Sequence, residues 1–295
     1  MLAVHDLHKS FGDIRALQGC TFTVRPGEML GFLGPNGAGK TTAMRIIFRL
    51  IKPDTGTVTW KGTPISEDDL LRFGYMPEQR GLYPKMRAGD HLAYLGRLHG
   101  MNKAAARSAA EMWLARFGLG DRMGDPVESL SHGNQQRVQL IASLVHDPDL
   151  LVLDEPFSGL DPIAVETMSD VLLEQAAAGK AVVFSSHQLD LVEDLCEQVA
   201  IVNAGVVVVS GNVQDLKDAA PMRHLELEVD GDAFALLDQL EGVIETSIKG
   251  DRILATIDAA TDVRGFLARA QEAGQLRHFA YTTPSLSDLF REAVR

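Results

Sequence analysis

Cysteine and long hydrophobic runs are both scarce in this 295-residue sequence. The only cysteines are Cys20 and Cys196, which lie too far apart in sequence to suggest a disulfide framework or a zinc site. We therefore expect free thiols in a reducing compartment. The longest apolar stretch, "VAIVNAGVVVV", is well short of the roughly 18 residues that a membrane span needs, and the opening "MLAVHDLHKSFG" lacks the apolar core of a signal peptide. We expect a chain that does not cross a membrane by itself.

Positive charge is also in short supply. The 28 Lys and Arg residues against 40 Asp and Glu residues give a formal net charge of −12, which argues against a protein that coats nucleic acid through its bulk charge. Hydrophobic residues at 45% and charged residues at 23% are ordinary for a soluble globular protein. We expect no nucleic-acid partner, and the length allows one large domain and a small one.

The order of strand and helix patterns predicts two domains. Short β-branched runs such as "LLVLDEP" and "AVVFSSH" alternate with helical patterns, which indicates an α/β core with a largely parallel sheet. Strand patterns are missing between about residues 86 and 145, so we predict a helical subdomain there within a domain of residues 1–218. Residues 222–295 read βαββαβα, a ferredoxin-like order, with the first of these helices at "AFALLDQL". We predict a small α+β domain there.

A phosphate-binding loop is the clearest motif. "GPNGAGKT" at 34–41 fits G-x-x-x-x-G-K-[ST] between the apolar strand "MLGFLG" and the helix "TAMRIIFRL". Backbone amides of such a loop turn onto phosphate oxygens, its lysine reaches the β- and γ-phosphates, and its threonine hydroxyl ligates Mg²⁺. The alternative is a glycine-rich turn with an exposed lysine. The predicted nucleotide-binding residues are Gly34, Pro35, Asn36, Gly37, Ala38, Gly39, Lys40, Thr41 and Thr42.

Two carboxylates and a histidine follow apolar strands elsewhere in the chain. Leu150–Leu153 run directly into Asp154 and Glu155, and a buried parallel strand delivers such groups to the sheet edge where ligands bind. We expect Asp154 to hold Mg²⁺ and Glu155 to polarise the attacking water. His187 follows "AVVFSS" and could contact the γ-phosphate or that water. The alternatives are capping or surface acids and a structural histidine.

A second anion site is predicted in "SLSHGNQQRVQL" at 129–140. Ser131 is placed to cap the helix that runs on through Val138 and Leu140, and a helix start of this kind attracts anions. A second phosphate-binding element is redundant if both serve one nucleotide.

Together and in this order, these residues resemble the ATP-binding cassette (ABC) ATPases of transporters over residues 1 to about 218. The resemblance implies that "LSHGNQQR" is the ABC signature and that Gln79 in "GYMPEQRGLYP" is the Q-loop glutamine, which contacts Mg²⁺ and senses the permease. It also implies that "SGLD" is the D-loop, with Asp161 near nucleotide, and that Phe11 stacks on adenine. The alternative for Phe11 is an ordinary core aromatic.

The resemblance also explains the second anion site, since cassettes of this family pair head to tail. It implies that Ser131, Gly133 and Asn134 face a nucleotide held by the other subunit, either a second copy of this chain or a paralogous ATPase subunit. His132 and Asn134 depart from the commonest signature, LSGGQ, whereas the second glycine is retained as Gly133. The sequence is similar to the LSKGNQQ form of some exporter-type members.

The resemblance implies a cytoplasmic ATPase subunit, peripheral on the inner face of the cell membrane, that uses ATP and Mg²⁺ to drive a separately encoded integral-membrane permease. The C-terminal extension resembles the bacterial exporter-type (ABC-2) group, which handles drugs, antibiotics or ions. The expected catalytic residues are Lys40, Gln79, Glu155 and His187. The alternatives are a non-transport ABC ATPase acting on nucleic acid or ribosomes and a nucleotide-binding scaffold without hydrolysis. For the second domain, regulation or dimer contact competes with a stabilising appendage.

Overall fold

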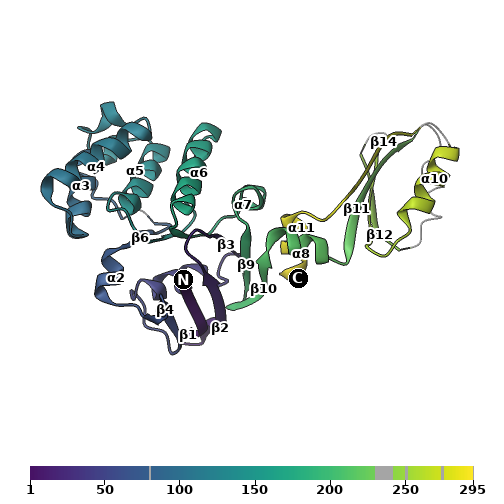
Figure 1. The fold of residues 1–295 in the computed structure, drawn as a ribbon, viewed down its shortest axis with the longest axis horizontal. Coiled ribbons are helices and arrows are strands. Elements are labelled where there is room, and N and C mark those ends of the chain that lie inside the picture. Colours follow the sequence, from purple (N-terminus) through teal and green to yellow (C-terminus); the bar gives the residue numbers. More distant parts are fainter. Residues whose placement is uncertain (80, 230–241, 250–251, 274–275, 295) are drawn as a thin grey trace. The chain divides into compact units, whose positions relative to one another are not determined.

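The structure is a computed structural model that describes residues 1–79, 81–229, 242–249, 252–273 and 276–294. It divides into two compact units, a first of residues 1–212 and a second of residues 213–293 (Figure 1). Helix α8 (Val213–Ala219) falls in the second unit. The helix that the sequence predicts at 233–240 lies outside the described residues.

A six-stranded sheet forms the centre of the first unit, in the order β10-β9-β3-β8-β7-β6. The strands from β9 to β6 pair in parallel and β10 joins the edge antiparallel. Every residue of β3, β7 and β8 is buried, as expected for parallel strands covered on both faces. The predicted α/β class is confirmed. In chain order the strands are β3 (Met29–Leu33), β6 (Phe73–Met76), β7 (Leu150–Leu153), β8 (Ala181–Phe184), β9 (Gln198–Asn203) and β10 (Val206–Asn212).

Helices alternate with the central strands of this sheet in the sequence: α1 (Lys40–Ile47) follows β3, α6 (Pro162–Ala177) follows β7 and α7 (Leu189–Leu195) follows β8. This is the alternation that the sequence predicts for an α/β core with a largely parallel sheet. The phosphate-binding loop is the connection from β3 to α1, so its position follows directly from the sheet.

A second, antiparallel sheet of the first unit has the order β2-β1-β4-β5. The rings of Phe22 and Phe32 lie 4.7 Å apart and those of Trp60 and Phe73 5.3 Å apart, so aromatic contacts join the two sheets in one hydrophobic core. Its strands are β1 (Leu2–Phe11), β2 (Ile14–Val24), β4 (Thr55–Trp60) and β5 (Thr63–Pro64), and the short helix α2 (Glu67–Leu71) follows them.

A separate group of helices occupies the stretch in which the sequence has no strand patterns (Figure 1). It contains α3 (Ala88–Leu98), α4 (Lys103–Arg116) and α5 (His132–Leu144), with short turns of 3₁₀ helix at Gly120–Arg122 and Val127–Ser129. Helix α5 also packs closely against β6, because a Cβ atom on Gly74 would lie 2.1 Å from the carbonyl oxygen of Ser143.

The second unit contains a four-stranded antiparallel sheet in the order β12-β13-β11-β14. This order matches the ferredoxin-like prediction. Alternate residues of β11 and β13, including Leu225 and Leu227, form a separate core on one face. The elements are β11 (Met222–Val229), β12 (Val243–Lys249), β13 (Arg252–Asp258), α10 (Val263–Ala273), β14 (Leu276–Thr282) and α11 (Leu286–Ala293).

Helix α11 is fixed to this sheet by polar contacts at its start. The Asp288 carboxylate accepts hydrogen bonds from the Ser285 amide at 2.9 Å and from its hydroxyl at 2.6 Å, and it lies 2.8 Å from His224 Nε2 on β11. Burial raises the pKa of the Asp288 carboxyl, but the contacts from Ser285 and His224 outweigh burial and hold this pKa well below its usual range.

Within the described part of the chain, no helix has the length and apolarity to span a bilayer.

The close approach of α5 to β6 gives a stability prediction. The substitution Gly74→Ala should lower the free energy of unfolding by about 1–3 kcal/mol, since the new methyl group would collide with the Ser143 carbonyl. Gly124→Ala is the matched control, because a Cβ there meets no atom within 4 Å. Urea denaturation of both variants measures the difference, and equal midpoints would contradict the packing.

Candidate functional site

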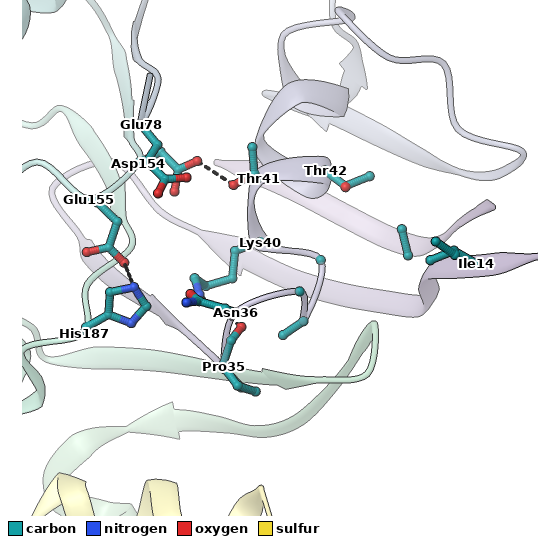
Figure 2. A pocket seen from close by; sticks show the side chains of 14 residues that line it. Ile14, Pro35, Asn36, Lys40, Thr41, Thr42, Glu78, Asp154, Glu155 and His187 are labelled. Atoms are coloured by element: carbon teal, nitrogen blue, oxygen red, sulfur yellow. Dashed lines mark hydrogen bonds and ion pairs between the residues drawn. The ribbon is translucent and has the colours of Figure 1, made fainter. Parts of the chain in front are cut away.

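A cavity of about 300 Å³ lies at the carboxyl ends of the central strands, where the phosphate-binding loop, the end of β7 and the end of β8 meet. Figure 2 shows Lys40 and His187 at this cavity. It also shows the carboxylates of Glu78, Asp154 and Glu155 there. Motifs more than 100 residues apart in the sequence are thus brought together. The lining residues are Ile14, Ala16, Pro35, Asn36, Gly37, Ala38, Gly39, Lys40, Thr41, Thr42, Glu78, Asp154, Glu155 and His187.

The phosphate-binding loop needs its glycines for space and for backbone conformation. A Cβ atom on Gly34 would lie 2.3 Å from the carbonyl oxygen of Val202, and one on Gly39 would lie 2.4 Å from that of Ala16. Gly39 also has a φ of 103°, a left-handed conformation that favours glycine. The loop therefore wraps tightly enough to present its amides and the start of α1 to the cavity.

Lys40 curls back over this loop. Its Nζ donates hydrogen bonds to the carbonyl oxygens of Gly34 at 2.6 Å and Pro35 at 3.3 Å. Burial lowers the pKa of the ammonium group, and the nearby carboxylates of Glu155 and Asp154 oppose that shift. The Lys40 amino group therefore lies in the cavity beside the loop amides, where a phosphate-binding lysine is expected.

Asp154 links several segments of the site and is only 1% exposed. One carboxylate oxygen accepts a hydrogen bond from the Thr41 hydroxyl and the other from the Ser185 hydroxyl, each at 2.7 Å. The Ser185 oxygen in turn accepts from the Glu155 amide at 2.9 Å. This chain of bonds joins the phosphate-binding loop, β7 and β8.

The oxygen donors of Thr41 and Asp154 fit Mg²⁺. This ion takes one or two protein oxygens together with substrate phosphates rather than a complete cage of side chains. The described residues contain no group of three or more His, Cys, Asp or Glu side chains placed to bind a metal by themselves.

Glu155 is held in an unusual backbone conformation, with a φ of 53°. Such a conformation costs a non-glycine residue about 1–2 kcal/mol and is often found at functional sites. Its Oε1 lies 3.0 Å from His187 Nε2 (Figure 2). Burial raises the pKa of the Glu155 carboxyl, although His187 and Lys40 oppose the shift. A raised pKa makes a carboxylate a stronger base near neutral pH.

Two residues predicted from the resemblance lie outside this cavity. Its lining includes Glu78 rather than the adjacent Gln79. Phe11 is 47% exposed at the end of β1, with Lys9 Nζ 5.4 Å from its ring centroid. The cavity wall on that side is formed by Ile14 and not by Phe11.

The predicted second anion site also lies outside the cavity lining. Ser131 caps α5 as predicted, and its hydroxyl accepts a hydrogen bond of 3.4 Å from the Asn134 amide. Gly133 lies in the first turn of α5, and Asp161 caps α6 by accepting from the Ala164 amide at 2.9 Å. None of the four predicted residues, which are Ser131, Gly133, Asn134 and Asp161, lines the cavity of this chain.

Two residues at the site, Ser185 and Glu78, are not among those predicted from the sequence. Ser185 stands between an apolar strand and His187 in "VFSSH", and a serine at a strand end was a signal that could have been used. Glu78 precedes Gln79 in "MPEQR", and no spacing rule separates the two side chains.

Comparisons with known proteins decide the family. Residues 17–158 match the model of the ABC transporter family, and residues 211–294 match the model described as ATP-binding protein DrrA1-3-like, C-terminal domain. The chain is 39% identical over its whole length to the uncharacterized ABC transporter ATP-binding protein YhaQ of Bacillus subtilis (strain 168), of which it covers 98%. The chain belongs to the ABC transporter ATP-binding proteins. It is therefore an ATPase.

Other similar proteins extend this assignment to both units. This ABC ATPase is 31% identical to the daunorubicin resistance ATP-binding protein DrrA3 of Streptomyces coeruleorubidus, across 98% of this chain and 94% of the relative. A solved dimeric structure of a bacterial ABC transporter cassette matches 72% of this chain and 98% of the solved chain, with 25% identity and a TM-score of 0.66.

The two hydrogen bonds of the Ser185 hydroxyl, to the Asp154 carboxylate and from the Glu155 amide, give a prediction about hydrolysis. Ser185→Ala removes a donor from Asp154 and leaves the Glu155 amide without its acceptor. Because an unpaired buried group costs about 1–3 kcal/mol, we expect ATP hydrolysis by this ABC ATPase to fall by roughly tenfold or more. Phosphate release measures the rate. The control is Ser169→Ala on α6, where the hydroxyl is buried with no described partner, and an equal loss in both variants would contradict the role of these two hydrogen bonds.

Proposed function

We propose that this chain is the subunit that binds and hydrolyses ATP for a separately encoded integral-membrane permease, and that it dimerises when ATP binds. The observation that carries the proposal is the separation of its parts. The loop, Asp154, Glu155 and His187 surround one cavity, whereas the predicted signature lies outside that cavity on the first turn of α5. A complete site then needs the signature of a second subunit.

The chemistry of hydrolysis follows from the groups around the cavity. The loop amides and Lys40 would hold the phosphates, and Thr41 and Asp154 would hold Mg²⁺. When bound, Mg²⁺ neutralises charge that develops on the phosphates. Glu155, whose pKa is raised by burial, accepts a proton from the attacking water. His187 lies 3.0 Å from the Glu155 carboxylate and orients it towards the γ-phosphate of the nucleotide.

Gly133 supports sharing of the site between subunits. A Cβ atom there would meet only Leu160 Cδ2 at 3.6 Å and the Gly159 carbonyl oxygen at 3.8 Å, which are ordinary contacts. Nothing within the described part of this chain therefore requires glycine at position 133. A close approach from outside would require it, and the phosphate of a nucleotide held by the facing subunit is such a group.

Export is the transport direction that we propose, with a drug, antibiotic or ion as substrate. The support is the full-length similarity to a daunorubicin resistance protein and the match of residues 211–294 to a DrrA1-3-like domain. We place the subunit in the cytoplasm on the inner face of the membrane, where ATP is available to it and the permease can be reached.

The test uses Glu155→Gln, which keeps the shape of the side chain and removes its basicity. We expect this variant to bind ATP, to lose nearly all turnover and to accumulate as an ATP-bound dimer, because binding and proton transfer use different groups. Adding Gly133→Ala should raise the ATP concentration needed for the dimer by roughly tenfold or more, on the scale of one lost charge-assisted hydrogen bond.

Analytical ultracentrifugation without ATP and over a range of ATP concentrations measures the dimer, and phosphate release measures the turnover. The control is Gly124→Ala in the same Glu155→Gln background, since position 124 has free space for a methyl group. Wild-type turnover in Glu155→Gln would remove Glu155 from the role of base. Equal dimerisation with and without Gly133→Ala would count against the shared site.

A further inference from the structure

Two glutamines on α5 are buried although the amide is a strongly polar group. Gln136 is 6% exposed and Gln139 is 3% exposed. They stand three residues apart and therefore share one face of the helix. Buried amides are normally retained only where they make hydrogen bonds, so their partners indicate what this face of α5 holds in place.

Gln136 holds the turn that contains the proposed base. Its Nε2 donates to the carbonyl oxygens of Glu155 at 3.2 Å and Pro156 at 3.0 Å. The turn is closed by the Ser158 amide, which donates to the same Glu155 carbonyl at 3.2 Å. Because Glu155 has a left-handed backbone with a φ of 53°, contacts from outside the turn are needed to stabilise this conformation.

Gln139 makes the equivalent contact to the other loop at the cavity. Its Nε2 donates to the carbonyl oxygen of Pro77, the residue immediately before Glu78, which lines the cavity. The end of β6 and the end of β7 are also joined directly, because the Asp154 amide donates to the Met76 carbonyl oxygen at 2.7 Å. One face of α5 therefore bonds to the loop that follows β6 and to the loop that follows β7, and these two strands are neighbours in the sheet.

The first turn of the same helix carries Ser131 and Gly133, which we expect to meet the nucleotide of the other subunit. Gln136 is one turn further along α5. The helix thus spans the short distance between the surface offered to the partner and the backbone of Glu155.

We propose that Gln136 and Gln139 are positioning residues that tie the signature helix to the catalytic loops of the same subunit. Gln136 sets the backbone of Glu155, and Gln139 sets the loop of Pro77 and Glu78. A displacement of α5 when the two subunits close would then be transmitted to Glu155 of the same subunit. This transmission links the two ATP sites of a dimer. The inference rests on the proposed role of Glu155.

The decisive variant is Gln136→Met, which keeps a similar volume but removes the amide. The phosphate-binding loop is untouched, so we expect unchanged ATP affinity and KM, with kcat lower by roughly 10- to 100-fold, the effect of a small misplacement of a catalytic group. Gln139→Met should lower kcat in the same way through the Pro77 loop. The control on the same helix is Ser143→Ala, where the hydroxyl is buried and donates a hydrogen bond to the Leu140 carbonyl oxygen of α5 itself at 2.7 Å.

Steady-state hydrolysis, ATP binding and thermal unfolding are measured on the full chain. A wild-type kcat in Gln136→Met, or a loss of ATP affinity as large as the loss of kcat, would overturn the proposal, because either result is inconsistent with action through Glu155. If Gln136→Met does not fold, Gln136→Asn replaces it, since it retains an amide that is too short to reach both carbonyls; full turnover in that variant would also overturn it.

Glu155→Gln separates this inference from the proposed function. Wild-type turnover in Glu155→Gln means that the assignment of the base is wrong. An inactive Glu155→Gln together with a fully active Gln136→Met means that the assignment of the base stands and the positioning role is wrong.

Discussion

The structure of the site depends on one buried carboxylate, Asp154. It accepts hydrogen bonds from Thr41 and Ser185, and Ser185 accepts from the backbone of Glu155. A carboxylate that is 1% exposed is tolerated only where such partners replace water. These bonds fix the start of α1 against the ends of β7 and β8, so the loop that binds phosphate and the residue proposed as base keep one geometry.

The parallel sheet makes this arrangement possible. Its buried central strands deliver the phosphate-binding loop, Asp154 and His187 to one edge, which is where α/β folds place their ligands. Helix α5 adds further contacts to these loops, since its two buried glutamines donate hydrogen bonds to the backbone carbonyl oxygens of Glu155, Pro156 and Pro77. The second unit has a separate hydrophobic core, as expected of a module that folds around its own sheet.

Much of this could be predicted from the sequence, because the strong patterns are local. The glycine and lysine spacing of residues 34–41 predicts that the phosphate-binding loop lies at the sheet edge, and the apolar run before Asp154 predicts the same for that carboxylate. Ser131 also caps α5 as predicted. Contacts between distant segments could not be predicted in the same way. The pairing of Ser185 with Asp154 joins residues 31 positions apart, and whether Glu78 or Gln79 faces the cavity depends on the exact path of one loop. The position of Phe11 outside the cavity has the same cause, because the turn after β1 brings Ile14 to the wall instead.

Subunit mixing shows whether each ATP site is shared between two subunits. Lys40→Ala removes the loop cation from one subunit, and Ser131→Arg blocks the signature of the other. A dimer of the two variants contains one composite site with an intact loop and an intact signature. Hydrolysis measured across mixing ratios should therefore exceed the sum of the separate rates, with a maximum near equal amounts. A mixture whose rate never exceeds that sum would mean that the two subunits do not share their ATP sites.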